Sequence, residues 1–220
     1  MTLKAYIHRT SVHATLLLTF LICSLLNPAP ALALGNRESA IPDFAEFSRT
    51  VRNNDATVLR GVYVPDVLAL PIVPQPAGNP GYVSIQDEEV TQFGMAAQFG
   101  NVGLLAHNYL SGRLFSRLAP GGEVRLVYGD GTVEYFVITE VLEFQALQPN
   151  SLYSSFRNLR NDEMLSAEQV FNRVYRGERH VTFQTCIAGA ESMSWGRLFV
   201  IAAPKPQAAG IDRLGSRAGR

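Results

Sequence analysis

The middle and the end of the chain alternate between apolar and polar residues, a pattern that predicts strands. Residues 123–128 and 132–141 alternate on either side of Gly129-Asp130-Gly131, and an Asp-Gly pair supplies the positive φ that a tight hairpin turn needs. Three further short runs are also predicted as strands: 102–106, 180–186 and 197–203. A branched run at 58–73 is interrupted by Pro65 and Pro71, which is typical of edge strands.

Helical patterns are confined to short segments. Apolar residues at helical spacing predict a helix within 40–54, and three acids in a potential first turn favour another at 87–99. Ser166-Ala167-Glu168-Gln169 is a capping box that opens a third helix, and Gly177 ends it. The pattern as a whole predicts one mostly β domain at 57–203, with a partly helical lead-in at 34–56.

The first 33 residues have the layout of a secretory signal. Lys4 and Arg9 precede an apolar stretch at 14–26, and residues 27–33 end in small side chains, so cleavage is expected after Ala33. The alternative is a retained anchor that attaches the protein to the membrane, although prolines interrupt the stretch before the about 20 residues that a spanning helix needs. Either way we expect an exported protein: secreted, periplasmic or at the cell surface. Residues 204–220 are predicted to be a disordered basic tail.

Composition narrows the function. The chain has 19 basic and 19 acidic residues, so no positive excess favours nucleic-acid binding. Of its 2 cysteines, Cys23 lies in the signal, which leaves Cys186 as an intermolecular partner, a buried bystander or a reactive group. The histidines outside the signal are His107 and His180, and with so few ligands and no HExxH motif we expect no metal and no cofactor.

Cys186 ends a predicted strand before a long loop, where catalytic groups are often found. A nucleophilic cysteine needs a nearby imidazole or cation. His180 lies six residues earlier in the same strand, about 20 Å away, so we interpret it as structural. His107 ends the strand at 102–106 and could meet Cys186 if the two strands are neighbours. Arg197 opens the next strand, where its guanidinium could stabilise an oxyanion or hold a substrate carbonyl.

These residues, in their order and strand contexts, resemble the sortase family of cysteine transpeptidases. The resemblance rests on Ala106-His107-Asn108, on Thr182-Phe183-Gln184-Thr185-Cys186 and on Arg197-Leu198-Phe199-Val200, and it extends to Gly112–Leu118 and Pro120–Val124. It covers roughly 57–203 and implies a closed eight-stranded β-barrel with a few short helices.

The resemblance also implies roles for individual residues. Cys186 would attack the backbone carbonyl of a peptide sorting signal to form a thioester, and His107 would be the general acid and then the general base. Arg197 would bind the oxyanion or position the substrate, the region of Thr185 would line the same cleft, and 150–179 would be the recognition loop. The implied partners are the sorting signals of exported proteins and an amine acceptor of cell-wall or pilin type, with water as the alternative acceptor.

Two other functions stay open. One is a different cell-wall cysteine transpeptidase, although the Ser-His-Gly-Cys context typical of such enzymes is absent. The other is a non-catalytic exported barrel that binds peptide or wall polymer. Taken singly, a lone cysteine is more often a small buried apolar residue, and a lone histidine or arginine is more often structural or solvated. The three together, in order and at strand ends, favour the catalytic hypothesis.

Overall fold

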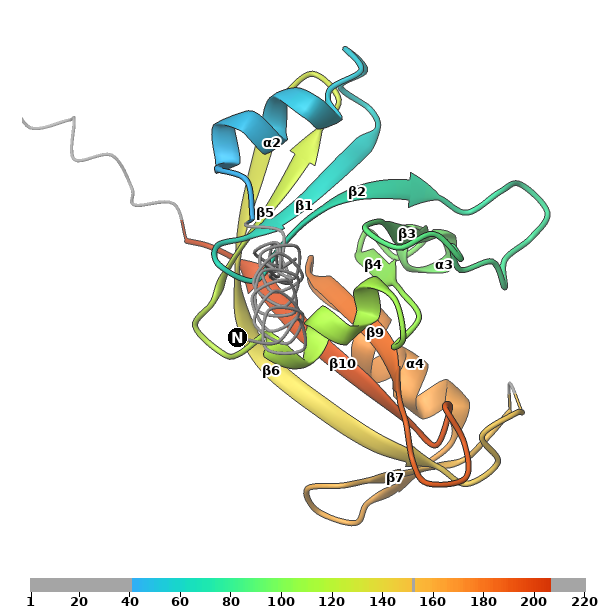
Figure 1. Ribbon diagram of the computed structural model, residues 1–220. Helices are drawn as coiled ribbons and strands as arrows, with labels where there is room; N and C mark the ends of the chain where they lie inside the picture. The colour runs from blue at the N-terminus through green and yellow to red at the C-terminus, as the bar shows by residue number, and fades with distance from the viewer. Residues whose placement is uncertain (1–40, 152, 207–220) are drawn as a thin grey trace, which may run out of the picture. The chain divides into compact units, whose positions relative to one another are not determined.

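The computed structural model describes residues 41–151 and 153–206, and ten strands within these residues join in one sheet (Figure 1). The strands are β1 Leu59–Val64, β2 Leu68–Pro74, β3 Val90–Phe93, β4 Val102–Leu105, β5 Glu123–Tyr128, β6 Val133–Ala146, β7 Phe156–Asn158, β8 Met164–Leu165, β9 Val181–Ile187 and β10 Gly196–Pro204. The helices are α2 Phe44–Val51, α3 Gly94–Ala97, α4 Ala167–Tyr175 and the 3₁₀ helix η1 Ser111–Arg117.

Eight of the strands close into a barrel. They follow the order β10-β9-β4-β3-β2-β1-β5-β6, and β6 pairs again with β10, while β7 and β8 extend the sheet beyond β6. β6 can close the barrel because its 14 residues serve two partners: Val133–Val137 pairs with β5 and Phe136–Gln145 pairs with β10. Two pairs, β2–β3 and β4–β9, are parallel. The predicted closed eight-stranded barrel is therefore confirmed.

Local signals in the sequence account for two of the elements. The β5–β6 hairpin turns at Gly131, whose φ of 93° is the positive value that glycine adopts without strain. α4 begins with the predicted capping box, in which the Ser166 hydroxyl accepts the Gln169 N–H and the Gln169 side chain accepts the Ser166 N–H. It ends just before Gly177, where φ is 103°.

Apolar side chains fill the barrel and also cover two patches of its outside. The interior is closed by η1, whose fully buried Phe115 packs edge-on against Phe183 of β9 with ring centroids 5.2 Å apart. α2 packs outside β1, where Gly61 leaves room for the ring of Phe47. α4 covers another outer patch that includes Phe144 of β6 and Phe199 of β10.

The prediction of a helix over 87–99 was wrong for most of its length. Residues Val90–Phe93 form β3, and only Gly94–Ala97 is helical. Val90 and Thr91 are fully buried and branched at Cβ, and pairing with β2 and β4 outweighs the helical pattern. Glu88 has a φ of 64°, so the acids form a turn rather than a first helical turn.

The prediction of edge strands over 58–73 was also wrong, because β1 and β2 each have partners on both sides. Pro65 lies in the turn between the strands, outside both. Pro71 is the last β2 residue paired with β1, and the pairing with β3 starts at Ile72, so a missing N–H is tolerated between the two ladders.

The predicted signal at 1–33 and most of the predicted tail at 204–220 lie outside the described residues. Within the described part, no helix has the length and apolarity that crossing a bilayer requires.

Candidate active site

Cys186 and Arg197 lie directly opposite each other in the sheet. β9 and β10 are antiparallel, and their register pairs Cys186 with Arg197. Residues opposite each other in such a pair have Cα atoms about 4.5–5.5 Å apart and side chains on the same face. The thiol is unpaired and half-buried, and the arginine is half-buried as well. The guanidinium group and the thiol therefore occupy the same face of the sheet at the start of the loop that joins the two strands.

His107 enters the same neighbourhood from the other side of β9. β4 runs parallel to β9, with Leu105 opposite Gln184, and the Ala106 N–H donates to the Gln184 carbonyl at 3.3 Å. His107 and Cys186 each lie two residues further along, so the same register, continued beyond the last pair, would set His107 beside Cys186. Partners in register share a face of the sheet, and the face of Gln184 and Cys186 is the outer face of the barrel.

Thr185 joins the two strand ends rather than facing outward. Its side chain is buried, and its hydroxyl donates to the Ala106 carbonyl at 2.8 Å. Gly112 of η1 packs closely against the backbone of the same segment. A Cβ on it would lie 2.7 Å from the Ala106 carbonyl oxygen and 2.6 Å from the His107 carbonyl oxygen. The hydroxyl of Thr185 is thus hydrogen-bonded within the protein.

The guanidinium of Arg197 donates hydrogen bonds to backbone carbonyls in and beside the surrounding loops. Its Nη1 donates to the carbonyls of Ser194 and Gly196, both at 2.9 Å, and its Nη2 donates to the Pro149 carbonyl at 3.4 Å. A guanidinium has five N–H donors, and the Nε–H and one Nη2–H have no hydrogen-bond partner among residues 41–151 and 153–206. Arg197 can therefore hold the β6–β7 and β9–β10 loops together and still stabilise a developing negative charge.

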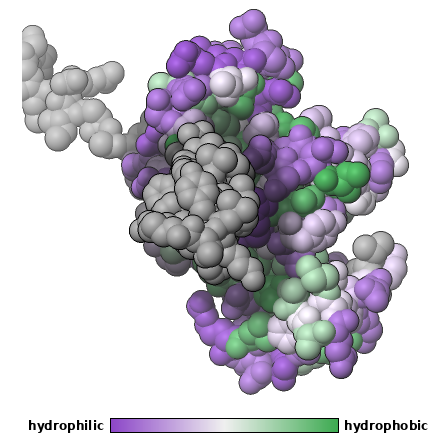
Figure 2. All heavy atoms as spheres, in the orientation of Figure 1, coloured by the Kyte–Doolittle hydropathy of each residue, from purple (hydrophilic) through white to green (hydrophobic). Residues whose placement is uncertain are grey.

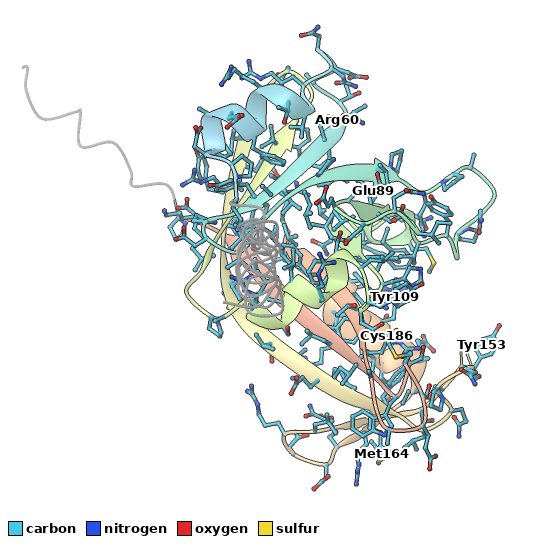
Figure 3. The ribbon with its side chains drawn as sticks, viewed as in Figure 1. Arg60, Glu89, Tyr109, Tyr153, Met164 and Cys186 are labelled. Carbon is cyan, nitrogen blue, oxygen red and sulfur yellow. The ribbon has the colours of Figure 1, made fainter. Side chains whose placement is uncertain are left out.

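Two residues that follow His107, and that sequence reasoning did not single out for a role, contact the site. The ring of Tyr109 stacks on the imidazole of His107, with centroids 5.2 Å apart and an angle of 17° between the planes. The Asn108 side chain donates to the Met193 carbonyl in the β9–β10 loop at 2.9 Å. The only signal in the sequence was their position beside the histidine. Figure 3 labels Tyr109, in the segment after β4, and Cys186, near the end of β9.

His180 stands apart from this group, at the residue before β9. It is buried, and its ring nitrogens lie 2.7 Å and 2.8 Å from the carbonyl oxygens of Glu178 and Val174. These contacts tie the end of α4 to the start of β9. The interpretation of His180 as a structural histidine agrees with this placement.

Two polar contacts support the site from neighbouring elements. The Tyr175 hydroxyl of α4 donates to the Gln184 side chain, and burial raises the pKa of Tyr175, so the hydroxyl stays a donor. The Arg113 guanidinium contacts Asp87 at 2.8 Å, holds the pKa of Asp87 below its ordinary value and ties the segment before β3 to η1.

The surface around Cys186 is mixed in character. Leu147 and Met193, in the loops on either side of Arg197, are 42% and 54% exposed, and Tyr153 in the predicted recognition loop is 89% exposed. Figure 2 shows apolar surface among polar surface at the lower right, where the ends of β7 and β9 lie in Figure 1. No group of three or more His, Cys, Asp or Glu side chains suited to a metal ion occurs in 41–151 or 153–206.

The molecule also has a cavity of ≈ 270 Å³ elsewhere, lined by the β1–β2 turn and by the segment 117–123. Neither His107, Cys186 nor Arg197 lines it. The assignment of a candidate active site therefore depends on the chemistry and the strand register of these three residues, and not on this cavity.

The chain was compared with family models, with curated proteins and with solved structures. No family model and no curated protein matches the chain. Among solved structures, sortase A of Listeria monocytogenes is 14% identical, with 69% of this chain and 89% of that chain covered and a TM-score of 0.43. Sortase C-1 of Actinomyces oris is 14% identical, with 77% and 84% covered and a TM-score of 0.46. Sortase C1 of Streptococcus agalactiae is 15% identical, with 72% and 74% covered and a TM-score of 0.44. The solved structures that resemble this chain thus include sortases named A and C.

Proposed function

We propose that this protein is an exported sortase-like cysteine transpeptidase, which cleaves a peptide sorting signal through a thioester on Cys186. The observation that supports the proposal most is the register of three adjacent strands. β4, β9 and β10 are neighbours in that order, so β9 lies between the other two strands. Cys186 of β9 is paired with Arg197 of β10, and the β4–β9 register, continued by two residues, would set His107 beside Cys186 on the opposite side. An imidazole and a guanidinium on either side of a thiol are the groups that nucleophilic acyl transfer requires.

The chemistry would proceed in two acyl transfers. In the first, Cys186 Sγ forms a bond to the carbonyl carbon of the peptide, the C–N bond breaks, and His107 gives a proton to the departing amine. In the second, an amine attacks the thioester carbon, His107 takes its proton, and Sγ leaves as the thiolate. Water in place of the amine would release a carboxylic acid, so the same site would then act as a hydrolase.

Arg197 and Thr185 would act around the reacting atoms. The Nε–H and remaining Nη2–H of Arg197 would donate to the oxyanion that forms in each step. The buried Thr185 hydroxyl would keep the ends of β4 and β9 together, and its backbone would line the substrate cleft. The peptide would come from other exported proteins, and the amine acceptor would belong to the cell wall or to a pilin subunit.

Reactivity of the thiol tests the catalytic assignment without a known substrate. A free thiol is only about 3% thiolate at pH 7. If His107 and Arg197 stabilise the thiolate, iodoacetamide should alkylate Cys186 about tenfold faster than it alkylates a cysteine in a denatured chain. The full chain is used, and peptide-level mass spectrometry separates Cys186 from Cys23. His107→Ala should slow the reaction at Cys186 to the denatured rate. An ordinary rate in the wild type that is unchanged by His107→Ala would reject the catalytic assignment and favour the non-catalytic binding barrel.

A peptide library then tests the reaction itself. The full chain is incubated with the library and hydroxylamine, which attacks a thioester to give a peptide hydroxamate and the free thiol. Hydroxamates should form with the wild type and not with Cys186→Ala, and their sequences would give the cleavage motif. A fast-reacting thiol with no hydroxamate from any extended peptide, but with hydroxamate from peptidoglycan stem peptides, would favour the other cell-wall transpeptidase.

Export has its own test. Expression in a bacterial host should yield a mature protein whose amino terminus is Leu34, the residue after the predicted cleavage site. An unprocessed protein in the membrane fraction would instead support the retained anchor.

A further inference from the structure

The imidazole of His107 has no hydrogen-bond partner in the described part of the chain. A catalytic histidine is usually oriented by a third group that binds its second nitrogen, as a carboxylate does in a Ser-His-Asp triad. Within residues 41–151 and 153–206, the ring of His107 makes a different contact, the stack with Tyr109. The centroid distance of 5.2 Å and the angle of 17° place the two rings nearly parallel, so Tyr109 covers one face of the imidazole.

Tyr109 is held in this position by its backbone rather than by burial. The side chain is 57% exposed, and its one ring contact with a described residue is with His107. The backbone is fixed because the His107 carbonyl accepts the N–H groups of Leu110 and Gly112 at 3.0 Å and 3.1 Å. On the other side of Tyr109, Asn108 is bonded to the β9–β10 loop. The Tyr109 ring is exposed, so it contributes little to the packing of the core. Because its backbone is firmly held, the ring is well placed to contact His107.

We propose that Tyr109 is the positioning residue of His107, an inference that rests on the proposed function. Its ring blocks rotation of the imidazole and leaves the edges of the imidazole, where the nitrogens are, free for Cys186 and the substrate. The stack also contributes an aromatic contact that holds the imidazole in one orientation. At an exposed site we expect this contribution to change the rate roughly two- to fivefold.

Alkylation of Cys186 by iodoacetamide at pH 7 measures the effect, with the full chain in every case. Tyr109→Ala should slow alkylation roughly two- to fivefold, and Tyr109→Phe, which keeps the ring, should react as the wild type does. Tyr109→Leu, which keeps apolar bulk but no ring, should behave as Tyr109→Ala. Tyr135 is the matched control, because it is an exposed tyrosine in a part of β6 that pairs with β5 and not with β10. Tyr135→Ala should leave the rate unchanged.

The proton resonances of the His107 ring supply a readout that a merely structural role would not move. They are assigned by their absence in His107→Ala, and the tyrosine ring current should displace them in the wild type and in Tyr109→Phe. In Tyr109→Ala and Tyr109→Leu they should move toward the positions of a free histidine. The melting temperature of each variant should stay near that of the wild type, since the side chain is more than half exposed.

The outcomes separate this inference from the function on which it rests. If His107→Ala slows alkylation while Tyr109→Ala does not, the proposed function stands and Tyr109 has no positioning role. If Tyr109→Leu reacts as fast as Tyr109→Phe, bulk rather than the stack is responsible, and the inference is wrong. If His107→Ala changes nothing, the proposed function and the inference fail together.

Discussion

Replacing Gly112 with alanine should force apart the strand ends that carry the candidate site. Gly112 is buried, and a Cβ on it would lie 2.6 Å from the His107 carbonyl oxygen, 2.7 Å from the Ala106 carbonyl oxygen and against the Thr185 hydroxyl. Two of these three neighbours are backbone atoms and cannot rotate away. Since such contacts essentially never fall below 3.0 Å, η1 must move away from the His107 carbonyl by at least the difference of 0.4 Å.

The free-energy cost of this movement has two sources, overpacking of the site and a weakened hydrogen bond. Overpacking a well-filled site costs about 1–3 kcal/mol. The shift also weakens the hydrogen bond from the Gly112 N–H to the His107 carbonyl, so the upper end of that range, about 3 kcal/mol, is expected. In a domain of this size the melting temperature should then fall by roughly 6–12 °C. Because the contact of η1 with the His107 carbonyl is disturbed, alkylation of Cys186 should also slow toward the rate of an ordinary thiol.

The assay is thermal unfolding followed by circular dichroism, with alkylation measured on the same samples below the transition. Gly81→Ala is the matched control, because the nearest atom to its Cβ would be 4.0 Å away. Its melting temperature should stay within about 2 °C of the wild type. A Gly112→Ala protein that melts with the wild type and whose Cys186 reacts at the wild-type rate would refute the packing argument and the linkage between η1 and His107.

Three further changes have expected outcomes. Thr185→Val leaves the buried Ala106 carbonyl without its partner and should lower the free energy of unfolding by about 1–2 kcal/mol in urea denaturation. Ser166→Ala removes the amino-terminal cap of α4 and should cost about 1 kcal/mol in the same experiment. Lys205, and after it Arg125, hold the pKa of Glu123 below its ordinary 4.5. The contribution of Glu123 to folding stability is therefore fully present above pH 4.5 and is lost as the pH falls through the lower pKa of the folded state. The free energy of unfolding should therefore decline below about pH 4.5, and Glu123→Gln should reduce the decline.

Each of these changes has a control or a contrary result. Thr139 is an exposed threonine on β6, so Thr139→Val should cost less than Thr185→Val, and equal losses would contradict the assigned role of the buried hydroxyl. A Ser166→Ala protein as stable as the wild type would show that the capping box contributes nothing to α4. An acid profile that is identical in Glu123→Gln and the wild type would remove Glu123 from the acid-sensitive groups.

Local chemistry explains which elements could be predicted. The hairpin at Gly129-Asp130-Gly131 and the helix opened by Ser166 depend on turn and cap contacts within a few residues, so the sequence pattern was sufficient. The segment 87–99 was misjudged because its acids resemble a first helical turn, whereas Val90 and Thr91 gain more from burial between β2 and β4. The closed eight-stranded barrel was predicted only through the resemblance, and the order of its strands only from the structure, since no local pattern encodes which distant strands pair.

The sequence by itself indicated the candidate site residues and the kind of element that ends at each of them. Cys186, His107 and Arg197 were recognisable by residue type, by their order and by their places at strand ends. The tertiary structure alone decided that the segments of His107 and Cys186 meet, because the contact that joins them, from Thr185 to Ala106, spans 79 residues and depends on the parallel pairing of β4 with β9. It alone showed the stack of Tyr109 on His107 and the use of three Arg197 donors by loop carbonyls. Such contacts depend on the position of the backbone in other elements. Closure of the barrel fixes the positions of all its strands together, so no single segment encodes these contacts.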